Sequence, residues 1–327
     1  MFRAVPGPRK TAYVLIVLAL LVVALCGLGP CLLAGLFSYL ILDRTDLFLR
    51  RSCVKPGTSR WCALGLFAVV ALGLAFIFYS FIRIGLERLP DLMDRVLPRL
   101  DDLATRLRVQ WPVENAQELR AYVLTAAKEN ARAVTKASGL LTRGFFQILV
   151  GMAVAVLKFL SPEEPAPEAK DLHSELLRES RARASLFLQS FARVMGAQVV
   201  IAAINTAITA AFLYGTGMPF RTFLTLTTFV CGMIPIAGNI ISNTVIIAAA
   251  LTRSNHLAVA ALVFLIAIHK AEYFLNSRVM GVSIQLPMWA TLLALLVGEA
   301  LLGVPGVILA PTLLYYVRAE LRLIPAP

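Results

Sequence analysis

The sequence predicts an all-α, polytopic membrane protein, and three observations support this fold class. Of its 327 residues, 59% are hydrophobic and only 15% are charged, and the mean hydropathy is +0.78. Soluble domains have about 45–50% apolar and roughly 25% charged residues. The apolar residues also form six to eight runs, two of them interrupted, and most of these runs approach the roughly 20 helical residues that a crossing needs. Helices are expected because a backbone in hydrocarbon must satisfy its own hydrogen bonds.

The charge pattern indicates a lipid bilayer as the main partner. The net charge of +12 would suggest nucleic acid in a soluble protein. Here the basic residues lie between apolar runs, where they orient a chain in a membrane, so no nucleic-acid partner is expected. The five cysteines include no C-x-x-C pair and the three histidines stand far apart. We therefore expect neither a metal site nor another cofactor.

Residues 1–85 are predicted to form an N-terminal membrane hairpin followed by a third span. The first arm, Thr11–Gly29, lacks a signal-peptidase site and is interpreted as an anchor. The second arm, Pro30–Leu42, is short for a crossing unless it extends through Asp43. The third span is Trp61–Ile82. By the positive-inside rule, the N-terminus and the first connector lie in the cytoplasm, because both are basic: Arg3, Arg9, Lys10, Arg44, Arg50, Arg51, Lys55 and Arg60.

Residues 86–143 are predicted to be extracytoplasmic amphipathic helices. Apolar residues recur there at alternating spacings of 3 and 4, which is a heptad seam: Leu86, Leu89, Met93, Val96, Leu100, Leu103 and Leu107. Pro90 and Pro98 are expected to weaken the seam as one continuous coil by kinking the helix, and Pro112 to end it before a second amphipathic stretch at 115–136. Two interpretations stay open. The stripe packs on itself or in the headgroup plane, or it forms a subunit contact in a homo-oligomer.

Residues 144–195 combine a fourth span, a stiff linker and a cytoplasmic amphipathic helix. The span is Gly144–Leu160, the proline-rich linker follows at 161–167, and the helix is Leu172–Met195. Four arginines of this helix would suit an anionic inner leaflet: Arg178, Arg181, Arg183 and Arg193.

Residues 196–327 are predicted to be a membrane core that contains two interrupted helices. Phe223–Leu251 is interrupted at 232–239, and Pro287–Val317 at 303–306, with the uninterrupted span Leu257–Asn276 between them. A fifth span, Gly196–Leu213, precedes both. If both interrupted segments cross the membrane there are eight spans, and if both turn back there are six. The C-terminus is cytoplasmic in either case.

The interruptions are the main pointer to a functional site. Proline removes a backbone donor and glycine admits non-helical angles, so the groups freed at each break need protein or a wet cavity around them. A pair of such segments is typical of the binding site of a secondary transporter. The alternative is a pair of proline kinks held by neighbouring helices. The candidate residues at the breaks are Pro235, Gly238, Asn239, Asn243, Gly303 and Gly306.

Polar groups within the apolar helices extend this candidate site, since each is costly in a membrane. Gln198 and Asn205 lie in the fifth span. His269, Glu272 and Asn276, at spacings of 3 and 4, form one helical stripe, which is either a hydrogen-bonding or coupling-ion site or a polar cluster at the interface. A third group is the carboxylate of Glu299, four residues before Gly303. No basic residue shares its helix, which makes it a candidate proton or cation acceptor.

The final third of the chain resembles the AI-2E family of bacterial transporters. The resemblance rests on residues 276–281, Leu286-Pro287 and the run from Leu296 to Pro311, together with 234–238, Gln198 and Glu272. It implies an oligomeric secondary transporter of the bacterial inner membrane, and it adds Arg278 to the candidate binding residues. The family is named for export of autoinducer-2, and some members are described as monovalent cation/proton antiporters. Glu299 stands where glycine is usual in that family, which indicates a proton-linked variant.

These observations lead to one functional hypothesis and two alternatives. We expect a multi-pass inner-membrane protein with both termini in the cytoplasm that exports a small solute, such as autoinducer-2, with ion or proton coupling. A monovalent cation/proton antiporter and a non-transporting oligomeric scaffold held by the heptad seam are the alternatives. No Walker motif, G-x-S-x-G or H-E-x-x-H motif occurs, so direct ATP drive and enzymatic activity are not expected.

Overall fold

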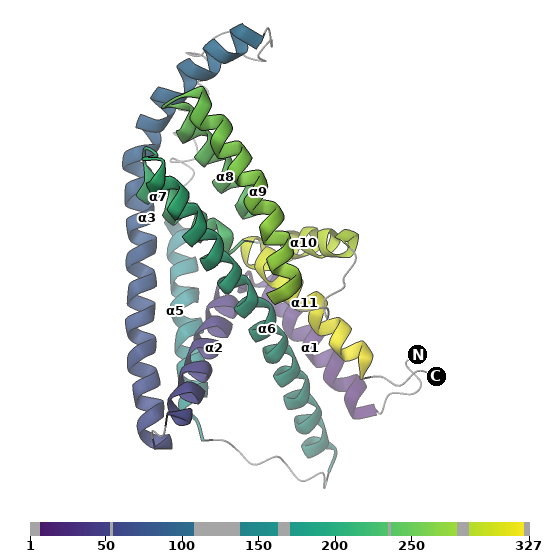
Figure 1. The fold of residues 1–327 in the computed structure, drawn as a ribbon. Coiled ribbons are helices and arrows are strands. Elements are labelled where there is room, and N and C mark those ends of the chain that lie inside the picture. The colour runs from purple at the N-terminus through teal and green to yellow at the C-terminus, as the bar shows by residue number, and fades with distance from the viewer. Residues whose placement is uncertain are drawn as a thin grey trace. The chain divides into compact units, whose positions relative to one another are not determined.

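The computed structural model describes residues 7–52, 55–107, 138–162, 171–234, 237–279 and 288–323, with parts of α3, α5, α8, α9 and α10 described by their backbone only. Every regular element in these ranges is a helix, which confirms the all-helical prediction (Figure 1). The helices are α1 (Gly7–Leu25), α2 (Gly29–Arg51), α3 (Pro56–Leu107), α5 (Ser138–Leu160), α6 (Leu172–Gly215), α7 (Arg221–Gly232), α8 (Ala237–Leu251), α9 (Asn255–Val279), α10 (Met288–Leu302) and α11 (Val304–Arg322).

Several of these helices have the length and hydropathy of membrane spans. Five described segments qualify: Gly7–Leu25, Gly57–Ser80, Arg143–Leu160, a stretch within Leu172–Gly215, and Asn255–Glu272. Two shorter apolar helices, Gly238–Leu251 and Trp289–Leu302, accompany them. Large apolar side chains such as Val17, Leu72 and Val263 lie on the surface of these segments, as expected for groups that face lipid. The chain is a polytopic helical membrane protein.

Two long helices differ from the sequence prediction. The third span and the heptad segment form one helix, α3, which continues through Pro90 and Pro98. The helix is therefore continuous across both prolines, and the predicted weakening of the coil at these positions stays a prediction. The amphipathic helix and the fifth span are likewise one 44-residue helix, α6. The predicted second amphipathic stretch at 115–136 lies outside the described residues.

The start of α6 is fixed by a reciprocal cap. The Ser174 amide donates to Asp171 Oδ1 (2.7 Å), and the Asp171 amide donates to Ser174 Oγ (3.1 Å). These pairings satisfy amides that a helix start leaves free. They also hold the pKa of the Asp171 carboxyl below its ordinary value, since the hydrogen bonds favour its charged form.

The chain divides into two compact units, and each is described by itself. Unit 1 comprises Met1–Ala71, Arg143–Ala197 and Met280–Pro327, and unit 2 comprises Leu72–Thr142 and Gln198–Val279. Three boundaries fall inside helices α3, α5 and α6, and the fourth at the end of α9. The division of the chain into four consecutive regions stays a prediction.

In unit 1, two apolar clusters hold the helices together. One contains Leu36 of α2, Phe191, Val194 and Met195 of α6, and Leu309 of α11. The other joins Leu42 of α2 to Ala63 and Phe67 of α3 and Phe159 of α5. These contacts account for the burial of α2 despite its charges, as each buried aliphatic or aromatic side chain contributes roughly 1.5–3 kcal/mol.

The predicted basic connector after the second arm is largely helical. Helix α2 continues through Asp43 to Arg51, and α3 begins at Pro56. The buried carboxylate of Asp46 explains this extension. It accepts a hydrogen bond from Ser59 Oγ (2.5 Å) and pairs with Arg50 at 2.8 Å, so it joins the end of α2 to the start of α3.

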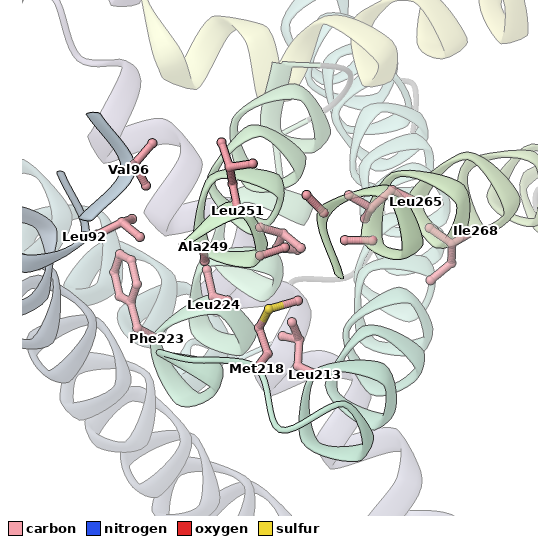
Figure 2. Close-up of a cluster of buried hydrophobic side chains, with 14 residues drawn as sticks. Leu92, Val96, Leu213, Met218, Phe223, Leu224, Ala249, Leu251, Leu265 and Ile268 are labelled. Carbon is pink, nitrogen blue, oxygen red and sulfur yellow. The ribbon is translucent and has the colours of Figure 1, made fainter. Parts of the chain in front are cut away.

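Unit 2 is built around one apolar cluster, which Figure 2 shows. Phe223 and Leu224 at the start of α7 pack with Ala249 and Leu251 at the end of α8. The two short helices therefore fold back on each other as an antiparallel hairpin. The cluster also takes side chains from α3, the end of α6 and α9: Leu92, Val96, Leu213, Leu265 and Ile268. Val96 is the one residue of the predicted heptad seam within this described core.

Candidate functional site

The first predicted interruption is present in unit 2, between α7 and α8. Helix α7 ends at Gly232 and α8 begins at Ala237. The two helices approach so closely beside the break that a Cβ at Gly238 would collide with the carbonyl oxygen of Cys231. Glycine is needed here for close approach, and it brings the first turn of α8 against the end of α7. Pro235 falls between the helices, outside the described residues.

Asn239 connects this break to α9. Its side-chain amide donates to both carboxylate oxygens of Glu272, at 3.0 Å to Oε1 and 2.8 Å to Oε2. The Glu272 side chain is only 14% exposed, so a charged acceptor lies in a largely desolvated position. His269 Nδ1 stands 3.7 Å from Oε2 and is an ion-pair partner only when protonated. His269 itself is largely exposed, which makes Asn239 the better-ordered partner.

Helix α6 supplies the third wall of the site. Gln198 Nε2 donates to the carbonyl oxygen of Gly232 at 2.8 Å, so it satisfies one of the carbonyls that end α7. Asn205 lies on the same face of α6 as Gln198, two turns further along, because a spacing of seven residues returns to the same side of a helix. Asn205 Oδ1 and its neighbour Thr206 Oγ1 are buried and find no hydrogen-bond partner among the described residues.

A small cavity lies between α6 and α9. Its volume is about 20 Å³, and it is lined by Asn205 and Glu272 together with apolar side chains: Ile201, Ile204, Ile208, Ile268 and Ala271. One water needs roughly 10–15 Å³ on this measure, so the cavity suits a single water or a small cation. Asn205 and Glu272 are thus the two polar residues that border a small space whose lining is otherwise apolar.

The structure gives fewer side-chain contacts for three other candidate residues of this unit. Asn243 is half-buried on α8, one turn beyond Asn239, and no side-chain hydrogen bond of Asn243 falls within the described part of the chain. Asn276 and Arg278 lie in the last turns of α9, but their side chains are outside the described residues. The predicted stripe on α9 is therefore described for His269 and Glu272 only.

The second interruption lies in unit 1 and also forms a hairpin. Helices α10 and α11 meet at Gly303, whose φ of 63° and ψ of −143° favour glycine (Figure 1). A Cβ at Gly298 would lie 2.5 Å from the Gly306 carbonyl oxygen, and a Cβ at Gly306 would collide with that of Gly298. The helices therefore pack backbone to backbone. Glu299 is exposed on α10, and among the described residues it forms no ion pair.

Sequence reasoning missed two features. The Gly232 carbonyl belongs to the unit 2 site as the acceptor of the Gln198 side chain, and the seven-residue spacing of Gln198 and Asn205 was the available signal for that face of α6. A buried charged cluster in unit 1 was also missed, in which Tyr13 and Arg183 contact Glu320. The prediction that Arg183 faces lipid headgroups is wrong, because this side chain is buried against the Glu320 carboxylate. Arg193 is exposed and donates to the hydroxyl of Tyr315, and its headgroup role stays a prediction.

The fold and the polar site together define a multi-pass helical membrane protein with a charged group held at a helix break. A family model described as "AI-2E family transporter" matches residues 11–325. Because this match covers nearly the whole chain, the protein belongs to the AI-2E transporter family, and the resemblance seen in the sequence is confirmed. The chain is also 33% identical over 127 residues to "Putative transport protein YdbI" of Bacillus subtilis (strain 168). That stretch covers 38% of this chain and 36% of the relative.

Proposed function

We propose that this transporter moves a small solute, with autoinducer-2 as the first candidate, by a secondary mechanism in which Glu272 binds the coupling proton or cation. The observation that carries the proposal is the pairing of Glu272 with Asn239 directly after the α7–α8 break. Charge on Glu272 attracts the Asn239 amide, and neutralisation of that charge weakens the attraction. Ion or proton binding thereby changes the contact between α8 and α9.

The cavity supports an ion, and not the solute, as the ligand at this position. Pockets for small organic molecules have volumes of about 300–1,000 Å³, whereas this cavity has about 20 Å³. The two polar residues that border it, Glu272 and Asn205, carry oxygens of the kind that hard cations and protonated water bind. Glu299 stays in the proposal as a second, more exposed carboxylate that could contribute to coupling.

The test is flux into proteoliposomes that hold the purified full-length protein. Autoinducer-2 uptake and proton-coupled sodium or potassium exchange are measured side by side for the unmodified protein, Glu272→Gln and Glu87→Gln. The last variant is the matched control, since Glu87 is exposed and pairs only with Arg83 in its described contacts. We expect Glu272→Gln to abolish the dependence of flux on the ion gradient and Glu87→Gln to retain it.

A monovalent cation/proton antiporter is the second candidate function, and the size and oxygen ligands of the cavity favour it. Cation exchange without autoinducer-2 flux would establish this candidate. Autoinducer-2 flux that is independent of every cation gradient, with Glu272→Gln fully active, would contradict the coupling role. If the unmodified protein shows neither autoinducer-2 uptake nor cation exchange, the non-transporting scaffold is favoured.

A further inference from the structure

A cluster of charged side chains in unit 1 joins three helix ends. Arg9 and Tyr13 lie near the start of α1, Glu179 and Arg183 in the predicted cytoplasmic section of α6, and Glu320 near the end of α11. Glu320 Oε2 accepts hydrogen bonds from the Tyr13 hydroxyl (2.8 Å) and Arg183 Nη1 (3.0 Å), and Arg9 Nη2 lies 3.6 Å from the same atom. One carboxylate oxygen therefore connects the three helices.

The cluster is closed and balanced in charge. Arg183 Nη2 donates to Glu179 at 3.1 Å, and Arg9 Nε donates to the Tyr13 hydroxyl at 3.2 Å. Both guanidinium groups also lie over the Tyr13 ring, 5.9 Å and 5.6 Å from its centroid. The two arginines offset the two glutamates, so the cluster lacks the excess charge that would attract an external anion or cation.

The cluster is nevertheless not optimised for a permanent contact. Arg183 Nε is buried and makes no hydrogen bond within the described residues, and Arg9 Nη2 is buried with only the long 3.6 Å ion pair to Glu320. A buried donor without a partner costs free energy that water would recover. Apolar side chains would stabilise a permanent contact between these helices at least as well. The attraction within a buried ion pair is largely offset by the cost of removing both charges from water. Incomplete satisfaction therefore favours a contact that opens.

Helix α1 buries little side-chain surface against the rest of unit 1. Ala12 is the single buried residue of α1, and it lies between Arg9 and Tyr13. The apolar side chains further along α1 are largely exposed, among them Val14, Val17, Leu18, Leu21 and Val22. Few apolar contacts oppose a movement of its N-terminal half once the charged contacts break.

We infer that Arg9, Tyr13, Glu179, Arg183 and Glu320 form a latch that holds the start of α1 against α6 and α11 and releases α1 during the transport cycle. Release gives the guanidinium groups of Arg9 and Arg183 access to water and uncovers Ala12. The part played in the cycle rests on the proposed function, whereas the latch itself is a property of unit 1.

The test uses thiol labelling of an Ala12→Cys variant of the full chain in which the five native cysteines are replaced by alanine. Ala12 has no exposed surface, so a membrane-impermeant methanethiosulfonate reagent reaches the thiol only after α1 separates. Ala261→Cys is the matched control, since Ala261 is equally buried but lies in the core of unit 2.

Glu320→Gln is expected to speed labelling of the Ala12→Cys thiol by at least about tenfold, because it weakens several charge-assisted contacts at once. Tyr13→Phe removes one hydrogen bond and should give a smaller increase. Labelling of the Ala261→Cys variant should not change. Unchanged labelling at position 12 overturns the latch, and an equal increase at position 261 overturns it too, because the cluster is then a requirement for folding.

The role in transport is tested with the unmodified latch in proteoliposomes. An imposed proton or sodium gradient should increase labelling of the Ala12→Cys thiol in the presence of the transported solute. No increase in a protein that transports overturns release during the cycle. A protein that moves neither solute nor cation contradicts the proposed function instead, and leaves the labelling test of Glu320→Gln as the measurement that decides the latch.

Discussion

The two helical hairpins of this protein arise from similar sequence signals but have different chemistry at their turns. In unit 2 the hairpin α7–α8 places a side-chain amide, Asn239, on the carboxylate of Glu272. In unit 1 the hairpin α10–α11 closes by backbone packing at Gly306, and its carboxylate, Glu299, is exposed. A break that contains glycine and proline thus lets two helices form a hairpin, but it does not by itself create a polar binding site. The polar partner on a neighbouring helix distinguishes the two.

The largest expected effect concerns the glycine that closes the unit 1 hairpin. A Cβ at Gly306 would meet the backbone of Gly298, which cannot rotate away as a side chain can. We expect Gly306→Ala to lower the free energy of unfolding by about 3 kcal/mol, at the upper end of ordinary overpacking. Thermal unfolding in detergent measures this change. Gly196→Ala, where a Cβ meets open space, is the control; equal losses in the two variants would contradict close packing as the cause.

The turn glycine of the same hairpin should have the next largest effect. Gly303 has a φ of 63° and a ψ of −143°, a backbone conformation that L residues rarely adopt. Nothing lies near its Cβ position, so Gly303→Ala isolates backbone strain from steric contact. We expect a loss of about 2 kcal/mol in the same unfolding assay. A loss as large as that of Gly306→Ala would mean that the turn, and not the backbone contact, limits the stability of the hairpin.

Removal of the polar contact at the unit 2 hairpin should have a smaller effect on stability. Asn239→Ala leaves the Glu272 carboxylate with a largely exposed histidine as its remaining described partner. We expect a loss of about 1.5 kcal/mol in unfolding free energy and a greater loss of ion-coupled flux. Asn243→Ala, one turn along α8, is the matched control. If both variants lose flux equally, the polar face of α8 as a whole is required, and the specific contact with Glu272 is not.

The sequence predicted the helices and the breaks well because both depend on local chemistry. Hydropathy located the spans, and the glycine and proline residues near 232–239 and at 303–306 located both turns. Polar residues in apolar helices marked Gln198, Asn205 and Glu272 as candidates because burial makes each of them costly. These three residues do meet the break or the cavity in unit 2.

What the sequence left open depends on contacts between distant segments. Whether a break turns back is decided by packing such as that of Phe223 with the end of α8, which spacing along the chain does not encode. The charged cluster of unit 1 pairs Tyr13 with a residue 307 positions away. The sequence placed Arg183 at the lipid headgroups because its partner, Glu320, lies on another helix and is distant along the chain.

The smallest expected effect on stability comes from the carboxylate of the unit 1 hairpin. Glu299 is exposed on α10 and makes no described ion pair, so Glu299→Gln should leave the unfolding temperature unchanged. Flux is the informative measurement, because an exposed carboxylate can still attract a proton or cation. We expect Glu299→Gln to lose less ion-coupled flux than Glu272→Gln, which acts from a desolvated position where charge interactions are stronger. A loss equal to that of Glu272→Gln, with stability unchanged, would show that the α10 carboxylate and the α9 carboxylate beside the α7–α8 hairpin contribute equally to coupling, despite their different exposure.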